Sequence, residues 1–165
     1  MRFRARTLLL SLLLTVAAAA AAGTVEVSFV NPASFIDAGG SQWDKDANLK
    51  ALERHLRSLG QRLPANQALG IELLDVDLAG SLQPARIRGE DVRVLTADAD
   101  YPRIHLKYTL VADGVTLASG TEWVTDLDYT HGLISRQRDP APLYYEKRML
   151  ETWFKTRFVD ARGGG

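Results

Sequence analysis

The sequence predicts a single α+β domain in which an antiparallel sheet of about four to five strands carries two helices packed on one face. Two segments, about residues 42–63 and 143–158, have apolar residues at a helical spacing. Between them lie segments in which apolar and polar residues alternate, as in strands with one buried face. The elements follow the order β-α-β-(β)-β-β-α, and a chain of 165 residues with 46% apolar residues can build one core.

Residues 1–22 have the three parts of a secretory signal peptide. Arg2, Arg4 and Arg6 form a basic start, an apolar run follows, and alanines provide the small residues before a cleavage site after Ala22. The alternative is an uncleaved membrane anchor. A membrane-spanning helix needs about 20 apolar residues, and this apolar run is shorter than that. We therefore expect export across the inner membrane of a bacterium into the periplasm, with no stable membrane span after cleavage.

The charge of the working protein depends on this export segment. The whole sequence has 20 basic and 20 acidic residues, and removal of three arginines with residues 1–22 leaves 17 basic against 20 acidic residues. We expect no nucleic-acid partner, because proteins that bind nucleic acid carry a basic excess. The chain has no cysteine, so the core must stabilise the fold without disulfides or thiolate metal sites. The domain is expected at residues 23–160, followed by a disordered tail at 161–165.

The first strand and the first helix follow the predicted cleavage site. Residues 24–30, TVEVSFV, alternate apolar and polar side chains as a half-buried strand does. Ser41 and Asp44 resemble a capping box at the start of a helix, and Gly60 with Pro64 marks its end. The buried face of this helix is predicted by a stripe of leucines, Leu49, Leu52, Leu56, Leu59 and Leu63.

The remaining strands are predicted in the middle of the chain. Residues 68–80 are typical of a central strand with an acidic end, and residues 92–95 form a short apolar stretch. The strongest strand pattern covers residues 103–128, where Asp113-Gly114 fits a type I′ hairpin turn. Counting back from this turn gives the expected facing pairs: Ala112 with Val115, Leu110 with Leu117, Leu106 with Thr121, Ile104 with Trp123, and His105 with Glu122.

Glu146 is the most unusual residue of the last predicted helix, residues 143–158. At about 100° per residue it falls inside the apolar arc of this helix, and a buried carboxylate needs a partner or a shifted pKa. We expect Glu146 to be buried and bonded to an arginine from elsewhere in the fold, with Arg103 as a candidate. The alternatives are a functional carboxylate in a pocket and a side chain exposed at the edge of the arc.

Two pairs of aspartates and one histidine are the candidate chemical groups. Asp75 and Asp77 lie two apart on a predicted strand, so their carboxylates share one face, and Asp126 and Asp128 repeat this spacing. If the two pairs met, they could hold a hard cation or act as an acid and a base. The structural interpretation is that they end strands and pair with Arg or Lys. His131, in a polar loop after the hairpin, is the histidine to test for function.

Four stretches of the mature chain stand in a distinctive order. They are VSFVNPASFIDAGG near the mature N-terminus, LDVDLAG at 74–80, ADYPRIHLKYTL at 99–110 and LYYEKRMLETWF at 143–154. Together, by their order and spacing, these stretches resemble the domain of unknown function 3016 family, a set of exported bacterial proteins. The resemblance implies an exported single-domain protein, and it assigns neither an activity nor a catalytic residue.

The functional expectations rest on the chemistry that the motifs offer. The sequence contains no G-x-S-x-G elbow, no S-x-x-K motif and no phosphate-binding glycine loop. We expect no cofactor and a non-enzymatic binding or envelope-interaction protein, whose partner is an envelope protein or a lipid-linked molecule. Its contact surface is expected at the edge strands and the loop 129–142. The alternative is a small exported hydrolase or metal-dependent enzyme that uses the clustered aspartates with His131.

Overall fold

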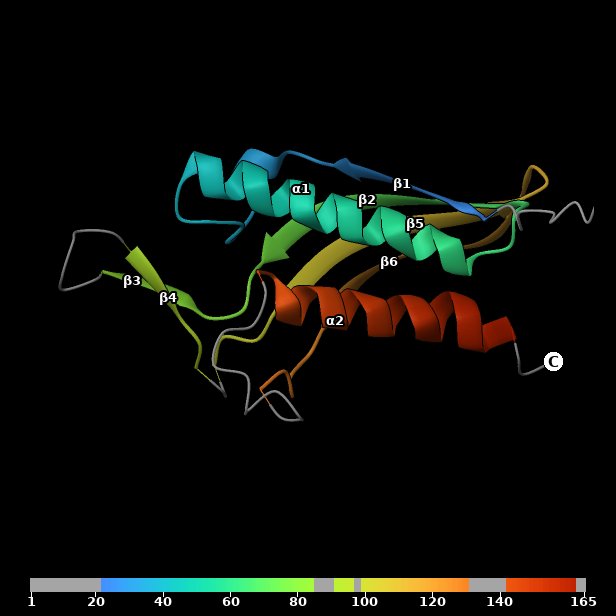
Figure 1. Cartoon of the computed structure of the whole chain (residues 1–165). Coiled ribbons are helices and arrows are strands. Elements are labelled where there is room, and N and C mark those ends of the chain that lie inside the picture. Colours follow the sequence, from blue (N-terminus) through green and yellow to red (C-terminus); the bar gives the residue numbers. More distant parts are fainter. Residues whose placement is uncertain (1–21, 85–90, 97–98, 131–141, 163–165) are drawn as a thin grey trace, which may run out of the picture.

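A computed structural model describes residues 22–84, 91–96, 99–130 and 142–162 of the chain (Figure 1). Within these ranges the elements follow in the order β1 (Thr24–Phe29), η1 (Pro32–Ser34), α1 (Gln42–Leu59), η2 (Gly60–Arg62), β2 (Gln67–Asp77), β3 (Ser81–Pro84), β4 (Asp91–Val94), β5 (Arg103–Ala112), β6 (Val115–Thr125), α2 (Tyr144–Phe154), η4 (Lys155–Val159) and η5 (Asp160–Arg162).

The described strands form a four-stranded sheet in the order β1-β2-β5-β6 and a separate ribbon of β3 and β4. Figure 1 shows α1 and α2 on the same face of the larger sheet, so the predicted α+β class is confirmed. One detail differs from the expected antiparallel sheet, because β1 pairs with β2 in parallel, whereas the other neighbours are antiparallel. The reason is that α1 forms a crossover, which carries the chain back to the end where β1 began.

Helix α1 begins and packs as its sequence predicts. The backbone N–H of Asp44 donates to Ser41 Oγ at 3.1 Å, and the backbone N–H of Ser41 donates to the Asp44 carboxylate at 3.2 Å. These two bonds complete the capping box, which satisfies donors that the helix itself leaves unpaired. The predicted leucine stripe is buried against the sheet along its whole length: Leu49, Leu52, Leu56, Leu59 and Leu63.

The hairpin of β5 and β6 has the predicted turn but a different register. Asp113 and Gly114 both have positive φ, 50° and 80°, as a type I′ turn requires, and Ala112 faces Val115 as expected. A bulge after the next pair, Val111 with Thr116, moves every later residue of β6 by one position. The expected pairing beyond this bulge is therefore wrong, and the observed pairs are Leu110 with Ala118, Leu106 with Glu122, His105 with Trp123 and Ile104 with Val124.

The core lies between the sheet and the two helices. Alternate side chains of β2 and β5 meet the inner faces of both helices, and the central residues Leu52, Leu73, Leu106 and Leu150 are fully buried. After Phe154 the last helix continues through a π-helical turn and a 3-10 turn, so the predicted helical segment at 143–158 is confirmed. No helix in the described ranges is long and apolar enough to cross a membrane.

Candidate functional site

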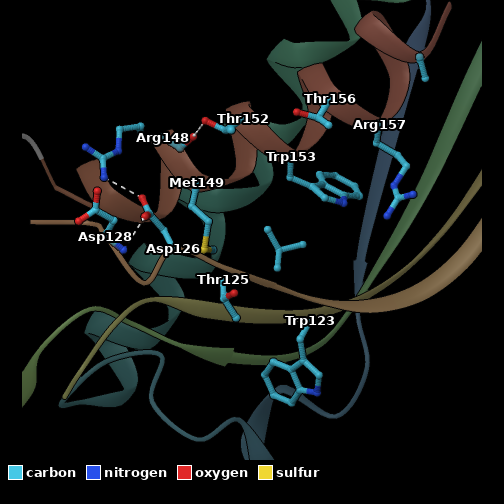
Figure 2. A pocket seen from close by; sticks show the side chains of 12 residues that line it. Trp123, Thr125, Asp126, Asp128, Arg148, Met149, Thr152, Trp153, Thr156 and Arg157 are labelled. Carbon is cyan, nitrogen blue, oxygen red and sulfur yellow. Dashed lines mark hydrogen bonds and ion pairs between the residues drawn. The ribbon is translucent and has the colours of Figure 1, made fainter. Parts of the chain in front are cut away.

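A groove of about 750 Å³ lies between helix α2, with the turns that follow it, and strand β6 (Figure 2). It is called the α2–β6 groove below. Ala161 adds to its lining at the C-terminal end. The helix side consists of Arg148, Met149, Thr152, Trp153, Thr156 and Arg157, and the strand side of Trp123, Val124, Thr125, Asp126 and Asp128.

The groove forms at this place because α2 is held against β6 by aromatic side chains. The Trp153 ring packs edge-on against the Tyr108 ring, with centroids 5.9 Å apart, and its Nε1–H donates to Glu122 Oε1 at 3.0 Å. Gly120 faces Tyr108 across the strands, where a Cβ would lie 2.9 Å from the phenolic oxygen. A glycine is therefore needed for the Tyr108 ring to support the helix.

Each end of the groove holds an ion pair between an arginine and a carboxylate. Arg148 donates to Asp126 at 2.7 Å and to the Tyr129 carbonyl at 3.0 Å. Arg157 forms an ion pair with Glu122 at the other end. Between these pairs, Figure 2 shows Met149 directed toward the strand, with Thr152 also part of the helix wall. The middle of the groove is therefore uncharged.

Trp123 lies on the other side of β6 from the helix (Figure 2), where it is 46% exposed. Its ring stacks on His105 at a centroid distance of 4.7 Å, and the Arg103 guanidinium lies 5.7 Å from the ring centre. The predicted pair of His105 with Glu122 is thus wrong, because the bulge turns Glu122 toward Arg157 and Trp153 instead. An exposed indole thus lies beside the edge of the sheet.

The four candidate aspartates each have a structural contact. The Asp75 carboxylate accepts from the Ile36 N–H at 2.8 Å, and Asp77 accepts from Arg103 Nε at 2.8 Å. Asp126 pairs with Arg148, and its Oδ1 accepts from the backbone N–H of Asp128 at 3.1 Å. Among the residues that the structure describes, no three His, Asp or Glu side chains gather closely enough to hold a metal ion. The geometry gives no support to the metal version of the enzyme alternative.

Glu146 is buried as expected, with 3% of its surface exposed, but its partner differs from the expected one. Its Oε1 accepts from the backbone N–H of Ala79 at 2.8 Å, whereas Arg103 is bound to Asp77. Burial raises the pKa of the Glu146 carboxyl, and the bond from Ala79 and the charge of Arg93 oppose that rise only in part. Arg93 itself binds Asp37 through two nitrogens. Glu146 therefore anchors the turn after β2 to helix α2.

The groove residues on α2 and η4 were not among the candidates from the sequence. Arg148, Thr152 and Thr156 recur every four residues, a spacing that is also typical of any solvated helix face. Only the position of β6 beside this face turns it into the wall of a groove. His131, the remaining candidate, lies outside the described residues.

Comparison with known proteins identifies the family of this chain. Residues 23–156 match the family model described as “Protein of unknown function (DUF3016)”. No curated protein and no solved structure matches the chain. The candidate site therefore has to be interpreted from its own geometry.

Proposed function

Since this chain belongs to the DUF3016 family, whose description assigns no activity, we propose a function from the site itself: an exported, non-enzymatic binding domain whose ligand occupies the α2–β6 groove. The observation that carries this proposal is the groove, with a volume of about 750 Å³. Ligand sites typically measure about 300–1,000 Å³ and combine apolar side chains with a few fixed polar groups. The α2–β6 groove has this composition.

The chemistry of the groove supports binding rather than turnover. Its arginines are engaged by carboxylates at both ends, and the helix side between them presents a thioether, hydroxyls and the Trp153 indole. Catalysis of hydrolysis calls for a nucleophile or a water activated by a base within hydrogen-bond reach. The lining threonines have no histidine beside them in the described lining.

Export is supported by the sequence of residues 1–22 and by the place where the fold starts. The family match begins at residue 23, directly after the predicted cleavage site. The N–H of Gly23 donates to the Leu63 carbonyl at 3.0 Å. A chain that starts at Gly23 keeps every strand and helix that the structure describes. We propose the periplasm as the location of the domain.

A titration followed by nuclear magnetic resonance tests this function. The protein, expressed as the full chain with isotope labels and purified after export, is titrated separately with peptide, glycan and lipid fractions of the envelope. We expect one fraction to move the signals of the α2–β6 groove, and Thr152→Trp, which fills the groove, to abolish the change. The matched control is Lys50→Trp on the exposed face of α1. If no fraction moves these signals, or if Thr152→Trp binds as wild type does, the groove is not the binding site.

A further inference from the structure

The outer edge of β6 offers hydrogen-bonding groups that no described strand uses. β6 is the last strand of its sheet, and among the described strands it has only β5 as a neighbour. In such a strand, every second residue directs its backbone N–H and C=O away from the sheet. This edge spans the residues Val115–Thr125, longer than most edge strands.

The sequence of this edge lacks the usual protection against strand addition. Soluble proteins place lysines, prolines or inward charges on exposed edges to prevent pairing with another chain. β6 reads VTLASGTEWVT, with no lysine, arginine or proline. Its one charged residue, Glu122, is bound by Arg157 and Trp153, and its bulge lies close to the hairpin turn. The stretch from Ala118 to Thr125 pairs regularly with β5 and leaves a regular outer edge.

The surroundings of this edge match the two faces of an additional strand. A strand added to β6 would lie about 4.8 Å from it and direct its side chains alternately to the two faces of the sheet. Side chains on the helix face would enter the α2–β6 groove beside Met149 and Thr152. Side chains on the open face would lie next to the exposed ring of Trp123, in cross-strand contact.

The chemistry of the groove selects among possible occupants. Ion pairs engage the arginines at its two ends, so small or apolar uncharged side chains fit between them better than charged ones do. A second copy of this chain would bring its own α2 against this wall. The exposed side chains of this wall are Thr152, Thr156 and Arg157, and Met149 is buried, whereas helix packing needs an exposed apolar stripe. A single extended segment, which has no helix to accommodate, fits the site.

We propose that the occupant of the α2–β6 groove is an extended polypeptide segment that adds to β6 as a further strand of the sheet, with small or apolar uncharged side chains facing α2. This inference rests on the proposed function of the groove as a binding site. Strand addition provides affinity through main-chain hydrogen bonds, while pockets for alternate side chains provide selectivity. The partner is therefore a protein of the same compartment with an exposed, extended segment.

Selection from a displayed library of random ten-residue peptides tests this proposal. The exported full-chain protein is the bait, and the best peptide is synthesised for measurements of Kd. We expect the bound peptide to slow hydrogen exchange of alternate amides in β6, and Thr152→Trp to weaken binding about tenfold or more. The control Lys50→Trp should leave Kd unchanged.

Two N-methylated versions of the same peptide make the decisive comparison, because they leave the protein untouched. Methyl groups on the set of alternate amides that face β6 should weaken binding about tenfold or more, and methyl groups on the other set should have little effect. Equal effects of the two sets would overturn strand addition. A β6-mediated dimer in sedimentation, broken by Ser119→Lys, would also overturn it.

The results separate this inference from the proposed function. If no peptide binds but a glycan or lipid fraction moves the groove signals, the inference fails and the binding function stands. If neither a peptide nor any fraction engages the groove, both fail.

Discussion

The carboxylate of Glu146 lies beneath the turn that follows β2, where it accepts a hydrogen bond from Ala79. Because burial raises its pKa in the folded protein, the folded state keeps its proton at pH values where the unfolded chain has already lost it. At pH values below about 4.3, the ordinary value of a glutamate, both states are protonated. As the pH rises from there through the folded-state pKa, the unfolded state binds fewer protons, so stability decreases.

We expect Glu146→Gln to remove this loss of stability, because the amide keeps an oxygen for Ala79 and does not ionise. Glu146→Ala should lower the free energy of unfolding by about 1–3 kcal/mol, because the Ala79 N–H is left buried without an acceptor. Urea unfolding at several pH values measures both effects. The control is Glu53→Gln, the same change at a surface ion pair of α1. A wild-type stability that rises with pH relative to that of Glu146→Gln would contradict the prediction.

At the scale of the elements, two glycines in strands of the same sheet have different roles. A Cβ at Gly120 would meet the Tyr108 ring at 3.0 Å, whereas a Cβ at Gly70 would meet only the Thr109 carbonyl oxygen at 3.9 Å. We expect Gly120→Ala to displace the Tyr108 ring and to destabilise the protein by about 1–3 kcal/mol, as overpacking does. Gly70→Ala should be neutral or slightly stabilising. Thermal unfolding of the two variants checks this, and equal effects would contradict it.

The two helices are joined by His55 of α1, whose Nε2–H donates to the Lys147 carbonyl at 3.0 Å. Burial lowers the pKa of His55, and the bond to Lys147 offsets this only in part. The unfolded chain therefore binds a proton at His55 more readily than the folded protein does. The neutral His55 ring stabilises the fold above about pH 6.5, and this stability is lost as the pH falls below that value.

We expect His55→Gln to flatten this dependence and to cost about 1 kcal/mol at pH 8, because the bond between the helices is weakened. Chemical denaturation between about pH 5 and pH 8 measures how the free energy of unfolding depends on pH. A magnetic-resonance titration of the ring reports its pKa. A His55 ring that titrates above the ordinary histidine value would contradict the prediction.

Sequence patterns within one element predicted the helices and most strands. Features that depend on contacts between residues distant in the sequence could not be predicted from such patterns. The leucine stripe and the Ser41 cap depend on neighbours within the same helix, so residues 42–59 could be assigned directly. The direction of β1 depends on how α1 crosses the sheet. The bulge in β6 exchanges Leu117 for Ala118 in the ladder, two apolar residues that periodicity cannot tell apart. The groove needs Thr152 and β6 to be neighbours in space, which the spacing within one helix does not reveal.

At the scale of the whole molecule, the predicted export segment ends where the fold begins, at Gly23. A Cβ at this position would lie 2.6 Å from both Leu63 Cβ and the Pro64 carbonyl oxygen, so only glycine fits where the mature chain is expected to begin. We expect the protein recovered from the periplasm to start at Gly23, as intact mass and N-terminal sequencing would show. Ala22→Arg should block cleavage, because the peptidase needs a small residue there, whereas Glu26→Gln should not. Recovery of an unprocessed wild-type chain would contradict this.

The parallel pairing of β1 with β2 has a consequence for how the protein folds. β1 is the first strand that the structure describes, yet its only described strand partner lies beyond α1. The hairpin of β5 and β6 closes over two residues and is the most local pairing in the sheet. Because closing long loops slows folding, we expect the amides of β5 and β6 to become protected first in pulse-labelled hydrogen exchange, and those of β1 last. With the predicted export, the strand that emerges first from the export channel would then be the last to pair in the sheet.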